Sequence, residues 1–173
     1  MNPLVSTALR LIDRVSPPAA VSAHCDVPCG IYDPHAAQIA ALTVLRMDQL
    51  IAGLARPAPD APQAEAAAAM NSLSRYIRTK EDHAELCKKE IDILWHDYFR
   101  PEHIEKFPDL HTTVWNANKL ASRNKQNADV KAAEELLTAV QRIAEIFWET
   151  KGVATRRGGS NQTVGGELVY VAG

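Results

Sequence analysis

A histidine and two cysteines lie close together in the stretch HCDVPCGIYDP, which runs from His24 to Pro34. Thiolates are soft metal donors and imidazole is a borderline one, so these side chains suit a transition metal. Pro28 lies between Cys25 and Cys29 and lets the chain fold back, so that both sulfurs can reach one ion. A closed tetrahedral zinc site would need a fourth ligand from elsewhere in the chain.

The missing ligands can come from the same segment if the chain is cut after Ala23. The preceding Val-Ser-Ala has the small residues of a cleavage site. Cleavage would give His24 a free α-amine, whose ordinary pKa of about 7.7–8.0 lets a metal deprotonate it near neutral pH. That amine, the Cys25 amide nitrogen and two thiolates would form a plane, with the imidazole above it. Planar nitrogen and sulfur donors favour nickel(II) or copper(II) over zinc.

Other uses of the thiols stay open from the residues alone. Cys25 and Cys29 could form a local disulfide or hold a structural metal. Cys87 is expected to be a buried helix cysteine. His83 and Cys87 are spaced four apart on one helix and could bind metal, but no further ligands are evident there.

The totals suit one soluble domain with a hydrophobic core. The chain has 173 residues, 46% hydrophobic content and a net charge of -2. This charge argues against a nucleic-acid partner, which would need a basic face. No stretch approaches about 18 uncharged apolar residues, so we expect no membrane span.

Residues 34–152 predict an all-α fold. Asp33 and Pro34 suit the start of a first helix, whose apolar stripe extends to Leu54. Three further amphipathic segments follow, at about 63–99, 109–123 and 129–151. Short polar connections between amphipathic helices imply an antiparallel, up-down-up-down four-helix bundle. The irregular segment 24–33 would precede it as a metal hook.

Both ends of the chain read as separate pieces. Residues 1–23 predict a removable leader, and Arg10, Asp13 and Arg14 interrupt the apolar centre that an export signal would need. We therefore expect an intracellular leader removed by a dedicated maturation protease and a cytoplasmic protein, with export as the alternative. Residues 153–173 are Gly-rich and are expected to form a flexible tail, although ELVYV could be a short strand.

The sequence HCDVPCGIYDP closely resembles the metal hook of nickel superoxide dismutases. Two further stretches, LWHDYFRPEHIEKFPDLH (94–111) and IFWETKG (146–152), are also similar to that family. The resemblance implies an enzyme that converts superoxide to dioxygen and hydrogen peroxide by Ni(II)/Ni(III) cycling. It also implies one nickel ion per subunit, a leader equivalent to the family's propeptide, and a homo-oligomer, a hexamer of bundles.

The resemblance implies roles for the hook residues. The metal ligands would be the His24 amine and imidazole, the Cys25 amide nitrogen and sulfur, and the Cys29 sulfur. Tyr32 would guide superoxide or bound water near the open face of the metal. Asp26, with Cys29, would offer a backbone N–H near the incoming anion.

The sequence departs from the family at two positions. Some members carry a glutamate and an arginine that steady the imidazole, and Ala40 and His83 stand in their places here. That support is therefore missing. Two other readings remain: a non-catalytic metal-carrying or metal-sensing bundle, and a thiol-disulfide protein that cycles between Cys25 and Cys29. Without the leader the net charge is -3, so any steering of superoxide must come from local lysines or backbone dipoles.

Overall fold

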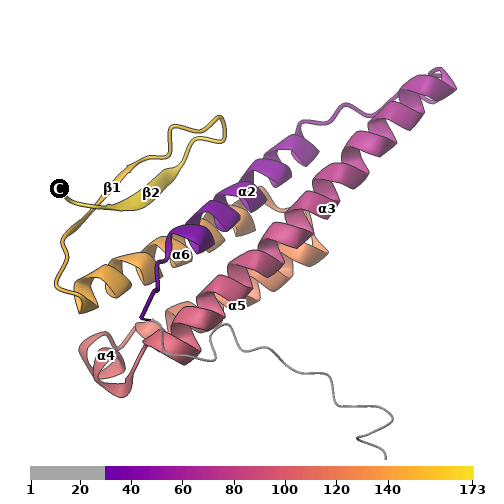
Figure 1. Cartoon of the computed structure of the whole chain (residues 1–173). Helices are drawn as coiled ribbons and strands as arrows, with labels where there is room; N and C mark the ends of the chain where they lie inside the picture. Colours follow the sequence, from indigo (N-terminus) through magenta and orange to yellow (C-terminus); the bar gives the residue numbers. More distant parts are fainter. Residues whose placement is uncertain (1–29) are drawn as a thin grey trace, which may run out of the picture. The chain divides into compact units, whose positions relative to one another are not determined.

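Four long helices alternate in direction through the part of the chain that this computed structural model describes, residues 30–173 (Figure 1). They are α2 (His35–Ala52), α3 (Gln63–Ile93), α5 (Leu110–Gln126) and α6 (Val130–Thr150). Both α2 and α5 pack between α3 and α6, so each long helix has two antiparallel neighbours. The predicted all-α, antiparallel four-helix bundle is confirmed. None of the described helices is long and apolar enough to cross a membrane.

Two short elements connect α3 to α5. The π-helix η1 (Leu94–Tyr98) continues α3 directly, and its wider turn is closed by the Phe99 N–H, which donates to the Leu94 carbonyl at 2.9 Å. Pro101 then begins α4 (Pro101–Lys106). The connection reverses the chain and brings the end of α3 beside the start of α5.

All four long helices contribute to the core, in which large apolar side chains of α6 face small side chains of α2. The regular apolar period of α6 places its large side chains inside, and they are listed here: Leu136, Leu137, Val140, Ile143, Ile146 and Phe147. Opposite them, Ala37, Ala40 and Ala41 are fully buried on α2. Small residues on one helix let the neighbouring helices approach closely, so the larger side chains of α6 fill the space between them.

The four long helices begin within one residue of the predicted positions, whereas α5 ends at Gln126, three residues later than predicted. The Asp33 carboxylate accepts the His35 N–H at 2.7 Å, and α2 begins at His35 rather than at Pro34. Asp129 caps α6 by accepting the Ala132 N–H at 3.1 Å. Gly152 follows α6 with a φ of +70°, a left-handed conformation that favours glycine.

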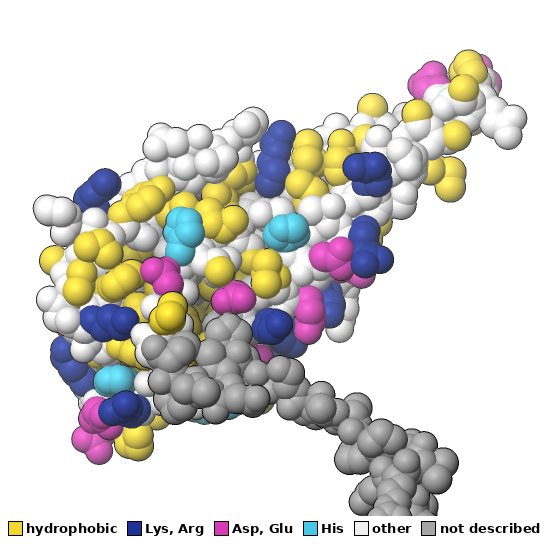
Figure 2. Space-filling model, in the orientation of Figure 1, with side chains coloured by type: hydrophobic (Ala, Val, Ile, Leu, Met, Phe, Trp, Pro, Cys, Tyr) yellow, Lys and Arg dark blue, Asp and Glu magenta, His cyan; other side chains and the backbone are white. Residues whose placement is uncertain are grey.

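The first half of α3 extends past the bundle. Its buried residues all lie at Lys80 or beyond, and none lies in residues 63–79. Met70 is 71% exposed there. Figure 2 shows hydrophobic side chains along this projecting arm at the upper right. Residues 63–79 are therefore helical without burying a side chain in the core.

The flexible tail that was expected for residues 153–173 is not what the structure shows. Strands β1 (Thr155–Gly159) and β2 (Glu167–Val171) pair antiparallel, with Arg157 opposite Val169. Leu168 and Val169 are buried, at 2% and 3% exposure. The sequence alone does not reveal this order, because the hairpin is held partly by α2, which lies far away in the sequence and bonds to Val169 through Gln38. The hairpin also packs against α6, which directly precedes it.

A buried ion pair joins α2 to α3. Asp48 Oδ1 lies 3.5 Å from Lys80 Nζ, and both side chains are almost fully buried. Lys80 Nζ also donates to the carbonyl of Asn127, which follows α5. Burial raises the pKa of the Asp48 carboxyl despite the nearby ammonium, because water no longer stabilises its charge.

We predict strong coupling between these two charges. Asp48→Leu alone should lower the free energy of unfolding by about 3–5 kcal/mol, because it leaves the Lys80 ammonium buried and unpaired. The double variant Asp48→Leu/Lys80→Met should recover most of that loss. Urea unfolding of the wild type, both single variants and the double variant measures the coupling. A double variant as unstable as the sum of the single variants would contradict it.

Candidate active site

The predicted metal ligands His24, Cys25 and Cys29, together with Asp26, lie outside the described residues. Gly30, the first residue that the structure describes, has a φ of +70°, a conformation that favours glycine. Of the predicted site residues, Tyr32 alone falls within the described part of the chain.

Tyr32 packs against a second tyrosine from a distant part of the sequence. Its ring centroid lies 5.6 Å from that of Tyr98, with the planes inclined at 54°. Tyr98 is the last residue of η1, and a π-helical turn changes the direction in which the side chain at its end projects. The two tyrosines are therefore brought together by the start of α2 and the end of α3.

Tyr98 is held by a chain of hydroxyl groups. The Thr150 hydroxyl donates to the Phe147 carbonyl at 2.6 Å, so its oxygen is left to accept. The Tyr98 hydroxyl lies 2.6 Å from that oxygen and is therefore the donor. A ring contact with Phe147 at 4.5 Å and a stacked contact with His103 at 5.7 Å fix the ring itself.

A lysine at the end of α6 supplies local positive charge. Lys151 Nζ lies 4.6 Å from the ring centroid of Phe147, 5.5 Å from that of Tyr98 and 5.8 Å from that of Trp148. Lys151 is exposed, so its charge faces solvent beside the tyrosine pair. On the face shown in Figure 2, basic and acidic side chains are interspersed. A local cation can therefore matter more to an approaching anion than the net charge.

Ala40 and His83, the positions at which the resemblance implies a glutamate and an arginine, do not form a charged pair here. Ala40 is 1% exposed and lies in the core of α2. His83 Nδ1 lies 2.9 Å from the Thr79 carbonyl of its own helix and donates to it. Ala40 thus packs in the core, and the His83 side chain bonds to the backbone of its own helix.

Within residues 30–173 no group of three or more His, Cys, Asp or Glu side chains could hold a metal ion. Cys87 is buried, as expected, and burial raises the pKa of its thiol to about 12. A thiol that stays protonated is a poor ligand, which argues against the His83–Cys87 pair. The described bundle thus offers no rival to the thiol-rich segment before α2, whose soft donors fit nickel(II).

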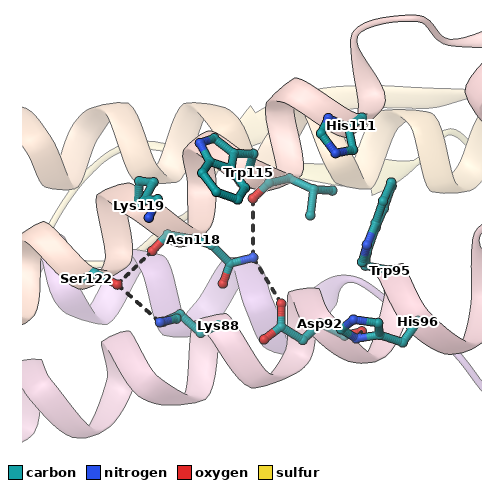
Figure 3. Close-up of a pocket in the computed structure, with 10 residues that line it drawn as sticks. Lys88, Asp92, Trp95, His96, His111, Trp115, Asn118, Lys119 and Ser122 are labelled. Carbon is teal, nitrogen blue, oxygen red and sulfur yellow. Dashed lines mark hydrogen bonds between the residues drawn. The ribbon is translucent and has the colours of Figure 1, made fainter.

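A groove of 310 Å³ between α3 and α5 is a separate feature (Figure 3). In it the Asn118 amide donates to the Asp92 carboxylate at 3.0 Å, and Lys88 donates to the Ser122 hydroxyl at 3.1 Å. Trp115 is 57% exposed on its wall, and Lys119 Nζ lies 4.6 Å from that ring centroid. These four polar side chains are paired within the groove.

Sequence reasoning missed Tyr98, which contacts Tyr32, and also missed Thr150 and Lys151, which contact Tyr98. The stretches 94–111 and 146–152, which carry the family resemblance, contain all three. No spacing rule predicts that residues 32, 98 and 150 meet. Their meeting follows from the bundle, which brings the start of α2 and the ends of η1 and α6 together.

Comparison with known proteins points to the same family as the hook sequence. The family model described as nickel-containing superoxide dismutase matches residues 19–151. The superoxide dismutase (Ni) of Streptomyces seoulensis is 40% identical over 139 residues, which is 79% of this chain and 94% of that protein. That of Streptomyces coelicolor is 39% identical over 136 residues, with the same shares.

Solved structures show the same fold. A nickel-containing superoxide dismutase with nickel ligation corresponding to the oxidised state superposes with a TM-score of 0.63 at 38% identity, covering 75% of this chain and 99% of that one. A native nickel superoxide dismutase gives 0.61 at 38% identity, covering 74% and 99%. The protein is thus a helical-bundle oxidoreductase by fold and relatives. It belongs to the nickel-containing superoxide dismutase family, as the hook sequence indicated.

The raised pKa of Cys87 predicts its reactivity. Because burial raises the pKa of the Cys87 thiol to about 12, the thiol stays protonated at pH 8, and the side chain is buried. Iodoacetamide at pH 8 should therefore leave Cys87 unmodified in the native protein and alkylate it in urea. Peptide mass spectrometry measures both states, with Cys87→Ser as the control for site assignment. Rapid alkylation of native Cys87 would contradict the buried, protonated thiol.

Proposed function

We propose that this member of the family becomes active when residues 1–23 are removed and His24 becomes the first residue. The His24 amine and imidazole, the Cys25 amide nitrogen and sulfur, and the Cys29 sulfur would then hold one nickel ion per subunit. The observation that carries the proposal is the Tyr32–Tyr98 contact, 5.6 Å between ring centroids. It builds an ordered polar site directly after the segment with the thiol donors.

The reaction joins two superoxide anions and two protons to give one dioxygen and one hydrogen peroxide. Bound nickel would supply the one-electron exchange, and anionic thiolate and amide donors favour its higher oxidation state. The protein must also admit a small anion, hold it and deliver protons. We assign anion contact to the backbone N–H groups of Asp26 and Cys29, and orientation of the anion or of water to the Tyr32 hydroxyl.

Tyr98 acts through Tyr32 in this proposal. Its own hydroxyl proton is donated to Thr150, so the ring is fixed and presents a firm surface to Tyr32. A tyrosine that is packed in this way loses little further freedom when it binds substrate. The bundle thus supplies the rigid part of the site, and the hook supplies the donors.

Lys151 supports entry of superoxide. It lies beside Tyr98 and faces solvent. A positive charge near the site raises the local concentration of an anionic substrate, which a net charge of -3 would otherwise lower.

Three further assignments complete the proposal. A maturation protease removes the leader, and the protein acts in the cytoplasm. The subunits form a homo-oligomer, a hexamer of bundles, as the family resemblance implies. Neighbouring subunits would then help to order a hook that has no core of its own.

The role of the amine predicts a sharp dependence on the first residue. A chain that begins at His24 should bind one nickel per subunit and remove superoxide. A chain that begins at Ala23 differs by one residue but converts the ligand amine into an amide, so its activity should fall by about 100-fold or more. Intact mass identifies the first residue, metal analysis gives the nickel content per subunit, and pulse radiolysis measures the rate of superoxide removal.

The matched control is the full-length chain, which masks the same amine with the whole leader. It should behave like the chain beginning at Ala23. Full activity in either extended chain, with its mass confirmed after the assay, would exclude the amine as a ligand.

Lys151 predicts a salt-dependent effect. Lys151→Gln should lower kcat/KM about threefold to tenfold at low ionic strength and flatten its dependence on salt, because the local attraction is lost. Lys119→Gln is the matched control: it removes the same charge from another exposed lysine over an aromatic ring. Equal losses in the two variants would show that only the net charge matters.

A further inference from the structure

The β-hairpin lies outside the region that the family model matches, which ends at residue 151. It is fastened to the bundle by glutamine side chains. Gln49 Nε2 donates to the Val164 carbonyl at 3.2 Å, and Gln141 Nε2 donates to the Glu167 carbonyl at 2.6 Å. The hairpin therefore holds α2 and α6 together across their exposed seam.

Two glutamines occupy the outer edge of β2. The ladder bonds from the Ser160 N–H to the Gly166 carbonyl and from the Ala172 N–H to the Ala154 carbonyl show which backbone groups face β1. In an antiparallel pair these alternate, so the backbone groups of Glu167 and Val169 point away from β1. Gln141 and Gln38 meet them there, each in the place that a third strand would take.

Gln38 resembles the backbone of a neighbouring strand more closely than Gln141 does, because its amide both donates to and accepts from one residue of β2. Its Oε1 accepts the Val169 N–H at 2.7 Å, and its Nε2 donates to the Val169 carbonyl at 3.2 Å. The side chain is 1% exposed. Both polar atoms of the amide are thus paired inside the protein, with no water needed to satisfy them.

Gln38 also closes the first turn of α2. Its own N–H donates to the Pro34 carbonyl at 3.2 Å. The start of α2 has no acidic residue in its first turn, and its local support is the single bond from the His35 N–H to Asp33. Helix ends with few local bonds fray unless tertiary contacts hold them. The hairpin provides such a contact four residues after Pro34.

We propose that the hairpin clamps the first turn of α2 through Gln38 and so fixes the point from which Tyr32 and the nickel hook extend. Gln38 is then a positioning residue for the reaction. This inference rests on the proposed function, because the hook must hold nickel for its position to matter. It also gives the C-terminal segment a role at the opposite end of the sequence.

The matched pair Gln38→Leu and Gln141→Leu tests the clamp in the full-length and the trimmed protein. Each variant breaks a buried glutamine contact to the same strand, but only Gln38 lies in α2. In Gln38→Leu the backbone amides of residues 38–42 should exchange with deuterium about tenfold faster, because the turn is no longer held. In Gln141→Leu these amides should keep their wild-type rates.

The second measurement is the electron paramagnetic resonance spectrum of the oxidised protein loaded with nickel alone. Gln38→Leu should change the g-values or broaden the signal, and Gln141→Leu should leave it unchanged. If Gln38→Leu does not fold, Gln38→Glu replaces it, since Glu keeps the acceptor for Val169 and loses the Nε2 donor.

Identical exchange at residues 38–42 in both variants, or an unchanged spectrum in the Gln38 variant, overturns the clamp. Failure of the proposed function is seen separately, in the wild type. If trimmed wild-type protein holds no nickel, both the proposed function and the positioning role are contradicted, whatever the exchange rates show.

Discussion

The short hydrogen bond from the Tyr98 hydroxyl to Thr150 joins the end of η1 to the end of α6, and the site depends on it. Thr150 can accept because its own proton is taken by the Phe147 carbonyl. That order of donors fixes Tyr98 against Phe147 and His103, and Tyr98 in turn supports Tyr32. The hydrogen bond between Tyr98 and Thr150, at the edge of an apolar cluster, thus helps to orient the uncharged side chain of Tyr32.

The fold could be predicted from the sequence because its information is local. The apolar period of α6, the Asp129 cap and Gly152 each act over a few residues, and the structure reproduces them. The proposed donors of the hook lie next to each other in the sequence, so the sequence alone is enough to propose them, and they stay a prediction because they lie outside the described residues. The contacts of Tyr98 could not be predicted, since they join residues 32, 98 and 150, and no local pattern encodes that distance.

The order of the hairpin also could not be predicted from its local sequence. Its sequence is short, Gly-rich and typical of a tail, and a two-stranded sheet is marginal by itself. Its order comes from Gln38 and Gln141, which offer amide groups in place of a neighbouring strand. The contacts of Gln38 with Val169 at the start of α2 are made by an uncharged amide group.

The projecting half of α3 has a consequence for how this protein can vary. Residues 63–79 bury nothing in the core, so their helix draws on alanine-rich local propensity and can open while the bundle stays closed. Insertions or deletions there would change the length of an arm without disturbing a packed layer. A change in the length of this arm would therefore leave the packed helices around the tyrosine pair in place.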